Sequence, residues 1–562
     1  MTKISVRPEL NSEEREKLNQ HSDITAHLLF HRGITDNDTA KEFLNPDYEK
    51  GTHDPFLFLG MDKAVSHILE AIKNEERICI YSDYDADGIP GAVILSDFFE
   101  KIEYKNYFVY IPHRNKEGFG LNMNAIQKIK DDSTDLIITI DCGIADEEEV
   151  DFINELGMKV IITDHHEPNG KKPKAIAIVN HKQEDCLYPD KNLCGSGVIF
   201  KVVQSLIMKG DFDINEGWEK WLLDLVGIAT LSDMVDLKGE NRVLAAYGLQ
   251  VLKKTRRKGI QKIFQKRKIN TETLTETDIV FMVTPQINAA SRMGDPIVAY
   301  HLLKETDDSK SEELVKHLGK INNERRGQVA SIVRDIKKHL GDSKPEAVGY
   351  GRPDWQPSLL GLACNSIAEE YKIPVYLWGR GDGKELKGSC RTGNGDSLVQ
   401  IMNELHEKGI LGNYGGHHGA GGFVIPSDKV DFLQTSLDDV MANMEKVEHE
   451  EFVDREININ EIDLDLIEDI NKLAPFGIGN IKPVFYLKNI IPENFRGIGQ
   501  TGAHLEISFR KENGDMIKAL EFYKTAEDLG IEEGKSLNLL INLEINYFNG
   551  RKDPRIKILK II

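Results

Sequence analysis

The feature that most constrains the fold is a regular alternation of two patterns between residues 77 and 180. Apolar runs rich in β-branched residues alternate there with segments of helical periodicity, in the order RICIYS, GAVILSDFFEKI, NYFVYIP, NAIQKIK, DLIITID, DEEEVDFINELG, KVIITD and AIAIVN. Such alternation predicts βαβ units on a parallel sheet, and so an α/β protein. Ligands of these sheets bind outside the carboxyl ends of the strands. We therefore expect the functional residues directly after the apolar runs.

Acidic and imidazole side chains stand at those positions. They are Asp83, Asp85 and Asp87 after the first run, Asp141 after LIITI, Asp164, His165 and His166 after VIIT, and Asp233 after GIATLS. If the chain stays extended after the first run, its three aspartates on alternate positions point to one face. Taken singly, an Asp-x-Asp after a strand is usually a turn or a helix cap. A lone His-His pair is likewise more often a surface or core element than a ligand. Their coincidence at several strand ends favours a shared site.

A divalent cation would explain this concentration of charge. Clustered carboxylates repel one another and destabilise the fold unless a cation neutralises them. Carboxylates mixed with imidazoles suit Mn²⁺ and can also hold Mg²⁺, whereas zinc is disfavoured because no thiolate joins the set. The set is large enough for two cations that share one carboxylate, and such a pair clamps phosphate and activates water. The sequence therefore predicts hydrolysis of a phosphoester.

The rest of the chain predicts further parts. Residues 196 to 340 have long helical periods, and 345 to 445 return to short apolar strands with the glycine-dense NYGGHHGAGGFVI. The acidic stretch at 445 to 463 is typical of a linker. Beyond LAPFGIGN come five alternating runs: VFYLKNI, AHLEISF, IKALEFY, LNLLINLEI and RIKILKII. Five strands in this length fit a small closed barrel such as the OB-fold, a common single-strand-binding module, or an unrelated five-stranded sheet.

Four aromatic residues of these runs are available to stack on bases: Phe485, Tyr486, Phe509 and Tyr523. Core packing is the commoner fate of an aromatic in a strand, so none of them is assigned to the site.

Charge and composition narrow the partners. The formal net charge of −21 argues against a polyanion ligand, yet KKTRRKGIQKIFQKRK at 253–268 has nine basic residues and no acidic one. Taken alone, this basic run is as typical of a solvated helix face as of a nucleic-acid surface. No run of about 20 apolar residues and no signal-peptide core is present, so we expect a cytoplasmic protein that does not contact a membrane. Six scattered cysteines predict neither disulfides nor a zinc site.

The motifs DYDADG, DCG, DHHEP, SDMVDL and GGHHGAGGF, in this order, resemble those of the DHH phosphoesterase family. Segments from LLFHRGITDNDTAKEFLNP near the start to AHLEI near the end make the chain similar to the single-strand-specific exonuclease branch of that family. The resemblance implies a parallel-sheet DHH domain with a helical connector, a second, smaller α/β DHH-associated domain and a C-terminal OB-like β-barrel. The expected ranges are an N-terminal helical segment at 1–50, the DHH catalytic domain at 51–215, the helical part of the catalytic core and connector at 216–340, the DHH-associated substrate-binding domain at 341–445 and the nucleic-acid-binding barrel at 455–562.

The resemblance also implies a role for each site residue. The metal ligands would be Asp83 and Asp85 for the first cation, Asp87, His165 and Asp233 for the second, and Asp141 as the bridge between them. The catalytic residues would be Asp141, His165 and His166, with His166 touching the scissile phosphate. The substrate-binding residues would be Gly416 and His417, which cradle phosphate, together with Arg114, Arg292, Ser389 and Arg391, of which the last three hold the 5′ end of the strand.

The implied function is metal-dependent hydrolysis of single-stranded DNA from its 5′ end to short nucleotides, in DNA repair and recombination. The expected partners are single-stranded DNA, a single-strand-binding protein and a helicase, and the expected oligomeric state is a monomer. Two alternatives remain open: a phosphodiesterase of short oligoribonucleotides or cyclic dinucleotides, and a replication scaffold that has lost its site. The intact acidic and imidazole set argues against the scaffold. The polarity of digestion and the choice of DNA over RNA rest on the resemblance alone.

Overall fold

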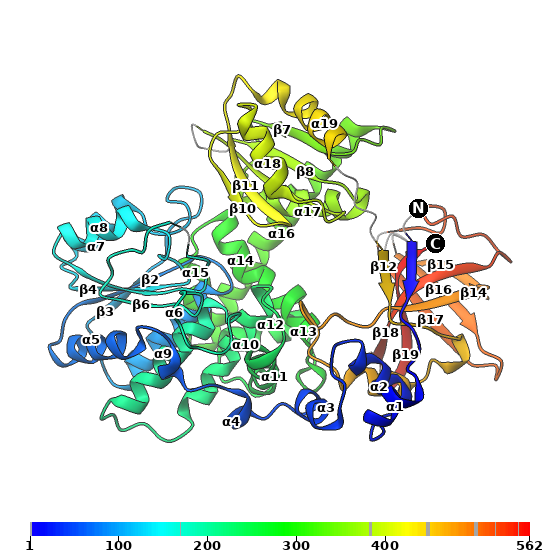
Figure 1. Cartoon of the computed structure of the whole chain (residues 1–562), viewed down its shortest axis with the longest axis horizontal. Helices are drawn as coiled ribbons and strands as arrows, with labels where there is room; N and C mark the ends of the chain where they lie inside the picture. Colours follow the sequence, from blue (N-terminus) through cyan, green and yellow to red (C-terminus); the bar gives the residue numbers. More distant parts are fainter. Residues whose placement is uncertain are drawn as a thin grey trace. The chain divides into compact units, whose positions relative to one another are not determined.

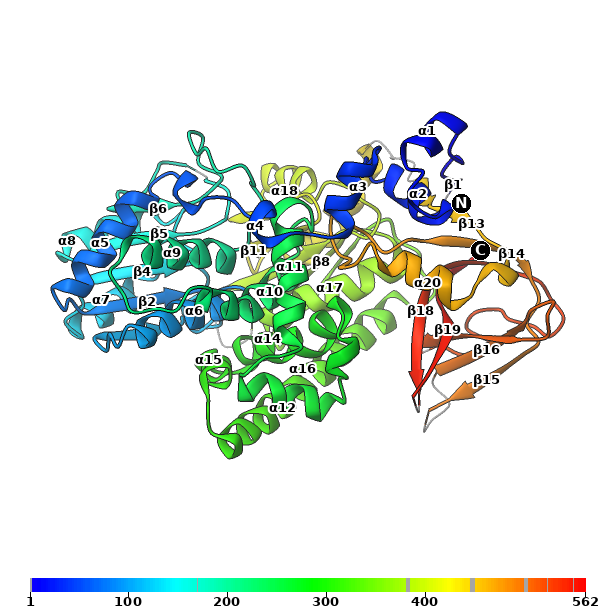
Figure 2. The same ribbon diagram turned by 90° about the horizontal axis from the view of Figure 1, so that it is seen from below.

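The computed structural model describes residues 3–168, 170–380, 385–444, 450–499, 504–522, 524–548 and 550–562. The chain separates into two compact units, a larger one of residues 52–235 and 239–447 and a smaller one of residues 1–51, 236–238 and 448–562. Figures 1 and 2 show its elements from two perpendicular directions. No helix in the described ranges is both long enough and apolar enough to span a bilayer.

A five-stranded parallel sheet opens the larger unit. Its strands lie in the order β3-β2-β4-β5-β6, and every neighbouring pair is parallel. They are β2 (Ile78–Ser82), β3 (Tyr107–Tyr110), β4 (Leu136–Ile140), β5 (Lys159–Thr163) and β6 (Ala177–Val179). β2 and β4 are buried along their whole length, because helices cover both faces of the sheet. The parallel sheet predicted from the alternation is confirmed.

Five helices flank this sheet in two layers. On one side lie α7 (Met123–Asp131) and α8 (Glu147–Glu155), and on the other α5 (Met61–Lys73), α6 (Gly88–Lys101) and α9 (Gly195–Lys209), as Figure 1 shows. Two of them, α6 and α9, start beside the carboxyl ends of the strands. α6 directly follows the turn after β2. This placement makes the strand ends and the starts of α6 and α9 the natural place for a site.

Helices also fill the chain that follows. They include α10 (Leu223–Ser232), α11 (Gly239–Leu252), α12 (Lys258–Arg267), α13 (Glu276–Asp278), the π-helix η4 (Ile279–Val283), α14 (Thr284–Met293), α15 (Ile297–Lys304) and the 33-residue α16 (Asp308–Leu340). The helical pattern expected for this stretch is present.

Part of the basic run at 253–268 forms ion pairs within the helical core. The Arg257 guanidinium is largely buried and pairs with Asp97 of α6 at 2.7 Å and with Asp224 of α10 at 3.1 Å. Lys253 and Lys254 are exposed. At least one cation of the run therefore connects two helices of the core and does not form part of a nucleic-acid surface.

A second five-stranded sheet completes the larger unit. Its order is β10-β11-β9-β8-β7, with β7 and β8 parallel and the other pairs antiparallel. The strands are β7 (Val348–Arg352), β8 (Val375–Gly379), β9 (Leu386–Arg391), β10 (Tyr414–Gly416) and β11 (Ala420–Ile425), and the helices are α17 (Pro357–Tyr371), α18 (Leu398–Glu407) and α19 (Leu433–Asn443). The glycine-dense segment forms the β10–β11 hairpin, at the edge of this sheet.

The smaller unit combines the chain's first helices with a β-rich domain. The helices are α1 (Ser12–Lys17), α2 (Asp23–Phe30), α3 (Asn37–Leu44) and α4 (Tyr48–Gly51). The first strand, β1 (Lys3–Val6), pairs in parallel with β12 (Glu450–Val453). Part of the acidic stretch expected as a linker is therefore a strand. Ile24 and Leu28 of α2 pack in one apolar core with the β-rich domain.

The β-rich domain has more strands than the sequence predicts. It is a seven-stranded sheet in the order β13-β14-β18-β19-β17-β16-β15, with α20 (Leu464–Asn471) beside it. The strands are β13 (Arg455–Glu456), β14 (Phe485–Ile490), β15 (Asn494–Ile498), β16 (His504–Arg510), β17 (Met516–Phe522), β18 (Leu537–Phe548) and β19 (Arg551–Ile561). Each of the five predicted runs contains a strand, but the count of five is wrong because β13 and β15 are missing from it. In the described part of the sheet no pairing joins β15 to β14, which agrees with the partly open barrel of an OB-fold.

Two of the four candidate stacking aromatics have structural roles. Phe485 and Phe509 are 0% exposed in the apolar core. Tyr486 is half-buried beneath the Lys488 ammonium, which lies 5.0 Å from its ring centre. Tyr523 lies outside the described residues. Core packing is thus the role of at least two of the four.

Candidate metal centre

The chain turns sharply after β2 and does not stay extended. The Asp85 carboxylate accepts hydrogen bonds from the backbone N–H of Asp87 at 2.8 Å and of Gly88 at 3.1 Å, and α6 begins at Gly88. A Cβ on Gly88 would lie 2.5 Å from the Asp83 carbonyl oxygen, so the turn requires glycine there. The expectation of an extended segment with three aspartates on one face is therefore wrong. Local hydrogen bonds to the short Asp85 side chain compete successfully with strand geometry.

Asp141 follows β4 in an unusual backbone conformation. Its φ is +63°, in the left-handed region, and its N–H donates a hydrogen bond to the Thr163 carbonyl oxygen at 2.9 Å. The residue is only 2% exposed. A left-handed conformation costs a non-glycine residue of order 1 kcal/mol, and such strain concentrates at functional sites. The strained backbone of Asp141 thus indicates a functional role for its carboxylate.

Asp164 organises the two histidines that follow it. Its carboxylate accepts hydrogen bonds from the backbone N–H of Ile144 (3.0 Å), His165 (2.7 Å) and His166 (3.1 Å), and it contacts the Nδ1 of His166 at 2.8 Å. Burial acts to raise the pKa of Asp164, but these hydrogen bonds and the His166 charge outweigh it and the pKa is lowered. Asp164 is therefore an ionised partner that orients the histidines. The sequence places it at this edge without indicating that role.

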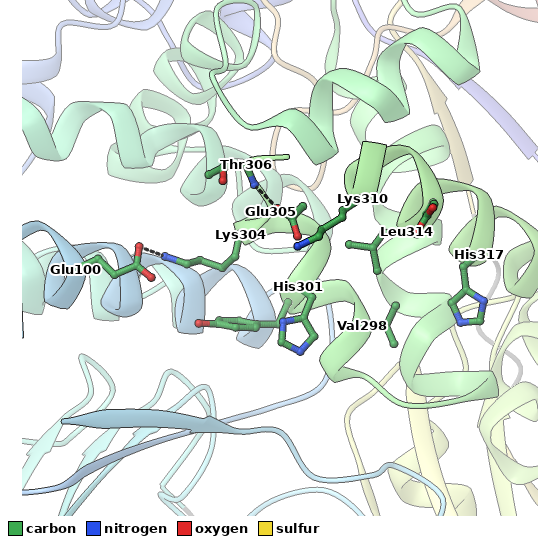
Figure 3. A pocket seen from close by; sticks show the side chains of 11 residues that line it. Glu100, Val298, His301, Lys304, Glu305, Thr306, Lys310, Leu314 and His317 are labelled. Carbon is green, nitrogen blue, oxygen red and sulfur yellow. Dashed lines mark hydrogen bonds and ion pairs between the residues drawn. The ribbon is translucent and has the colours of Figure 1, made fainter. Parts of the chain in front are cut away.

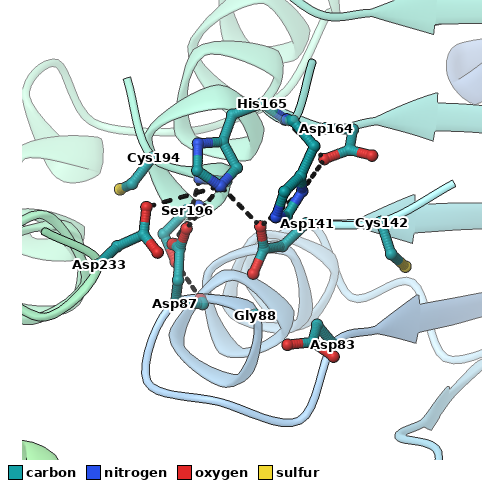
Figure 4. A network of polar contacts seen from close by, with 12 residues as sticks. Asp83, Asp87, Gly88, Asp141, Cys142, Asp164, His165, Cys194, Ser196 and Asp233 are labelled. Atoms are coloured by element: carbon teal, nitrogen blue, oxygen red, sulfur yellow. Dashed lines mark hydrogen bonds and ion pairs between the residues drawn. The ribbon is translucent and has the colours of Figure 1, made fainter. Parts of the chain in front are cut away.

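The predicted metal ligands converge at one edge of the sheet. Within each of three groups, one ligand atom from every residue lies within 4.8 Å of the others: Asp83 with Asp85 and Asp141, Asp87 with His165 and Asp233, and Asp141 with His165 and His166. Asp141 and His165 each belong to two groups, so the candidate ion positions adjoin. Figure 4 shows His165 between Asp87, Asp141 and Asp233. The elements that bring them together are the ends of β2, β4, β5 and α10.

Several ligand atoms are buried without a hydrogen-bond partner. They are Asp83 Oδ1, Asp141 Oδ1, His165 Nε2 and Asp233 Oδ2. The Nε2 of His165 lies 3.1 Å from Asp141 Oδ1, 3.5 Å from Asp233 Oδ2 and 3.9 Å from Asp87 Oδ2. Burial and the neighbouring His166 lower the pKa of His165 to about 3, so the ring is neutral at neutral pH. Unpartnered oxygen and nitrogen atoms buried this close together have the composition of a donor set for a metal ion.

The electrostatics of the carboxylates lead to the same conclusion. Burial, followed by the charges of neighbouring carboxylates, raises the pKa of Asp83, Asp141 and Asp233 well above the ordinary value and that of Asp87 to about 6. The set cannot ionise fully without added positive charge. Oxygen ligands with one or two imidazoles fit Mn²⁺ or Mg²⁺. The chemistry of these residues therefore fits divalent cations.

Two of the predicted substrate-binding arginines lie near the aspartate turn. The Arg114 guanidinium is 4.9 Å from the ring centre of Tyr84, which stands between two of the ligands in the sequence. Arg292 of α14 is half-buried, and it donates from Nη1 to the Ser358 carbonyl oxygen at 2.7 Å. Its Nε is buried without a partner. Burial, and then the charges of Arg114 and Arg325, lower the pKa of Arg292 to about 9. Cations crowded in this way favour an anion between them.

Ser389 and Arg391 lie on β9, beside the same helix that contacts Arg292. A Cβ on Gly361 of α17 would lie 3.1 Å from Arg391 Nη2 and 3.7 Å from Ser389 Oγ. Ser358, also on α17, returns a hydrogen bond from its hydroxyl to the Arg292 carbonyl oxygen at 2.9 Å. The start of α17 therefore gathers three of the predicted substrate-binding residues.

Gly416 and His417 lie on the β10–β11 hairpin and not at the start of α17. Both are exposed, and the N–H of His417 donates to the Ala420 carbonyl oxygen at 2.8 Å within the hairpin. A Cβ on Gly416 would lie 2.5 Å from the same carbonyl oxygen. The contacts described here keep both residues in the hairpin and do not join them to the aspartates.

A surface hollow lies away from the cluster. It measures about 780 Å³ and opens between α6, α15 and α16, where Lys304 reaches across to Glu100 at 2.6 Å (Figure 3). None of the predicted site residues lines it.

Three residues near the ligands are missing from the sequence-based set. Asn288 of α14 accepts a hydrogen bond from the Ala86 N–H at 2.8 Å and so supports the aspartate turn. Gly195 and Ser196, at the start of α9, donate backbone hydrogen bonds to the Asp87 carboxylate. Only the folded chain reveals what these three residues contact.

Three parts of the chain match models of known protein families. Residues 77–230 match the DHH family N-terminal domain, residues 344–443 the DHHA1 domain and residues 453–560 the RecJ OB domain. The single-stranded-DNA-specific exonuclease RecJ of Bacillus subtilis (strain 168) is 32% identical over 543 residues, which cover 95% of this chain and 67% of the relative.

Two solved structures are similar as well. RecJ in complex with Mn²⁺ from Thermus thermophilus has a TM-score of 0.83 at 24% identity and covers 100% of this chain and 79% of that one, which shows the fold. An exonuclease RecJ bound to manganese has a TM-score of 0.59 at 27% identity, over 69% of this chain and 96% of that one.

Proposed function

Because the chain belongs to the RecJ family of DHH proteins, we propose that it is a metal-dependent exonuclease that hydrolyses single-stranded DNA from its 5′ end to short nucleotides. One observation carries the proposal: unpartnered carboxylate and imidazole atoms converge in a buried space at the strand ends. A related exonuclease of known structure binds manganese, which supports Mn²⁺ or Mg²⁺ as the cofactor here. The proposed biological role is DNA repair and recombination.

The proposed ligand roles follow the three groups. Asp83 and Asp85 would hold one cation, Asp87, His165 and Asp233 the other, and Asp141 would contribute to both. Such a pair supplies an activated water and neutralises charge on the phosphate. The neutral imidazole of His165 supplies a lone pair. The carboxylates supply the negative charge that selects divalent cations.

His166 has a different proposed role. Burial acts to lower its pKa, but the hydrogen bond and the charge of Asp164 outweigh burial and the pKa is raised. Because Nδ1 contacts Asp164, Nε2 is the nitrogen available for the scissile phosphate. A protonated ring there would stabilise the negative charge of the phosphate as it develops.

We further propose that Arg292, Ser389 and Arg391 hold the 5′ phosphate, with Arg114 beside them. The buried, partnerless Nε of Arg292 and the mutual proximity of these residues around α17 support this. Gly416 and His417 of the exposed hairpin would cradle a phosphate of the strand. Binding of the 5′ end by fixed cations gives the enzyme its polarity, because only one end then reaches the metal pair.

The partners and the state in solution are also proposals. The match to a RecJ OB domain supports binding of single-stranded DNA by the smaller unit. We propose that the protein is a cytoplasmic monomer, which light scattering on the purified chain would test. The proposed protein partners are a helicase, which would produce the single-stranded substrate, and a single-strand-binding protein, which would protect it.

The deciding experiment uses purified full chain, Mn²⁺ and single strands labelled at either end. We expect a 5′ label to be released first in short products, while a 3′ label stays in strands that shorten gradually. Early release of the 3′ label, or undiminished cleavage of duplexes with blocked ends, would contradict the proposal. A length series separates the alternative, since a phosphodiesterase of short oligoribonucleotides would prefer two to five nucleotides over long strands.

A further inference from the structure

The start of α9 is hydrogen-bonded to one of the proposed metal ligands. The N–H of Gly195 donates to Asp87 Oδ2 at 2.6 Å, and the N–H of Ser196 donates to Asp87 Oδ1 at 2.7 Å. The Ser196 hydroxyl donates to the Asp87 carbonyl oxygen at 2.5 Å. Figure 4 shows Ser196 directly beside Asp87. Asp87 is therefore held through both carboxylate oxygens and through its backbone.

The same turn of α9 also contacts the proposed bridging ligand. A Cβ on Gly195 would lie 2.6 Å from Asp141 Cβ, 2.7 Å from Asp141 Oδ1 and 2.8 Å from Asp141 Cγ. All three distances are below what real Cβ atoms show, so the Asp141 carboxylate occupies the space that a side chain at position 195 would need. Gly195 is thus in contact with two proposed ligands that follow different strands, β2 and β4.

We propose that Gly195 and Ser196 are positioning residues that fix the Asp87 and Asp141 carboxylates relative to each other so that both cations can bind. A carboxylate oxygen has two acceptor sites, so each oxygen of Asp87 can accept one backbone hydrogen bond and still face a cation. The Ser196 hydroxyl holds the Asp87 backbone as well, so loss of any of these three hydrogen bonds lets Asp87 move and leaves a cation to order it. The inference rests on the proposed metal centre and adds residues that do not touch the cations or the DNA.

Two variants separate the contributions. Ser196→Ala removes the hydroxyl but keeps both backbone hydrogen bonds to the carboxylate. Its control is Ser205→Ala on the same helix, which removes an equally buried hydroxyl that donates to the Lys201 carbonyl oxygen at 2.9 Å. Gly195→Ala forces the Asp141 carboxylate to shift. Its control is Gly197→Ala, where the added Cβ would meet only Leu193 and Cys194 at ordinary distances of 3.5 to 4.0 Å.

The measurement is a Mn²⁺ titration of each full-length variant, in which electron paramagnetic resonance counts the bound ions and reports spin coupling between them. We expect Ser196→Ala to bind one of its two ions roughly 10- to 100-fold more weakly, as for other groups that orient metal ligands. Its turnover should recover at high Mn²⁺, because mass action replaces the lost order. We expect Gly195→Ala to lose the spin-coupled signal, while both controls keep wild-type affinity.

Each outcome bears on the inference. Wild-type affinity and coupling in both variants would overturn it, as would an equal loss in the controls. If Gly195→Ala does not fold, as seen by circular dichroism in EDTA, the comparison of Ser196→Ala with Ser205→Ala decides the question alone. A wild-type chain that binds no Mn²⁺ would instead contradict the proposed function itself.

Discussion

The Oδ1 of Asp164 and the Nδ1 of His166 lie 2.8 Å apart, and this contact favours the protonated imidazole. Burial alone would lower the pKa of His166, and Asp164 raises it. The raised pKa belongs to a ring whose Nδ1 lies 3.8 Å from the proposed bridging ligand, Asp141.

Asp164→Asn should shift the pH dependence of the reaction. A raised pKa means that the proton is present below the pKa and is lost as pH rises through it. Without the carboxylate the pKa falls, so the alkaline decline of kcat/KM should move to lower pH. We expect kcat/KM at pH 8 to fall roughly 10- to 100-fold. A pH–rate profile of both proteins with single-stranded DNA checks this, and superimposable profiles would contradict the role assigned to Asp164.

Manganese affinity should rise with pH. Burial, followed by the Asp85 charge, raises the pKa of Asp87 to about 6, and this carboxyl must lose its proton before it binds a cation. We expect tighter binding at pH 7.5 than at pH 5.5, with protons released on binding. Calorimetric titration in buffers of different ionisation enthalpy measures both. An affinity independent of pH would show that Asp87 is not a ligand.

The metal-free protein should respond to pH in the opposite direction. A carboxyl whose pKa is higher in the folded than in the unfolded state favours folding at low pH, and this contribution is lost as pH rises through the folded pKa. For Asp87 the contribution disappears between about pH 4 and 6 and is on the order of 3 kcal/mol. Urea unfolding in EDTA should therefore show wild type losing stability relative to Asp87→Asn as pH rises from about 4 to 6. The amide also has a cost that does not depend on pH, because its NH2 group cannot accept one of the two backbone hydrogen bonds.

Asp141→Asn should abolish hydrolysis and leave the fold intact. Asparagine has nearly the same shape and tolerates the left-handed backbone at φ +63°, but it cannot neutralise two cations. We expect kcat to fall on the order of a thousandfold or more, while binding of single-stranded DNA is largely kept. Fluorescence anisotropy with a labelled strand and an exonuclease assay test the two parts. A variant that unfolds would mean that this carboxylate is structural.

Arg257→Met should destabilise the larger unit strongly. The change leaves the buried Asp224 without its cation, which typically costs about 3–5 kcal/mol, while Asp97 keeps the Lys304 ammonium at 2.6 Å. Its neighbour Arg256 offers a matched control, because it is exposed and contacts the ring of Trp221 at 3.8 Å. Arg256→Met should cost less than about 1 kcal/mol. Urea unfolding compares them, and equal effects would contradict a bridging role for Arg257.

The sequence predicts the main sheet and the meeting of its ligands for a physical reason. Parallel strands covered on both faces read as continuous apolar runs, and their carboxyl ends must share one edge, so Asp141 and His165 could be brought together without coordinates. The path of the chain between Asp83 and Asp87 could not be predicted in this way. A single side chain, that of Asp85, decides it through two local hydrogen bonds.

Other features depend on contacts between distant segments. β15 contains Gly497 and mostly exposed side chains, so its sequence lacks an apolar pattern, and its pairing with β16 alone makes it a strand. The contact of Gly195 with Asp141 joins positions 54 residues apart and depends on the absence of a side chain. No periodicity in a sequence records such an approach.

The neighbouring strands β2, β4 and β5 at the centre of the sheet also set the spacing between the ligands that follow them. Adjacent strands are about 4.8 Å apart, while paired catalytic cations sit about 3.5–4 Å apart, so hydrogen bonding between main chains supplies nearly the right interval before any side chain is chosen. A slip of one residue in either ladder would turn a ligand toward the opposite face. The chemistry of this site is therefore as sensitive to strand register as to the identity of its acids.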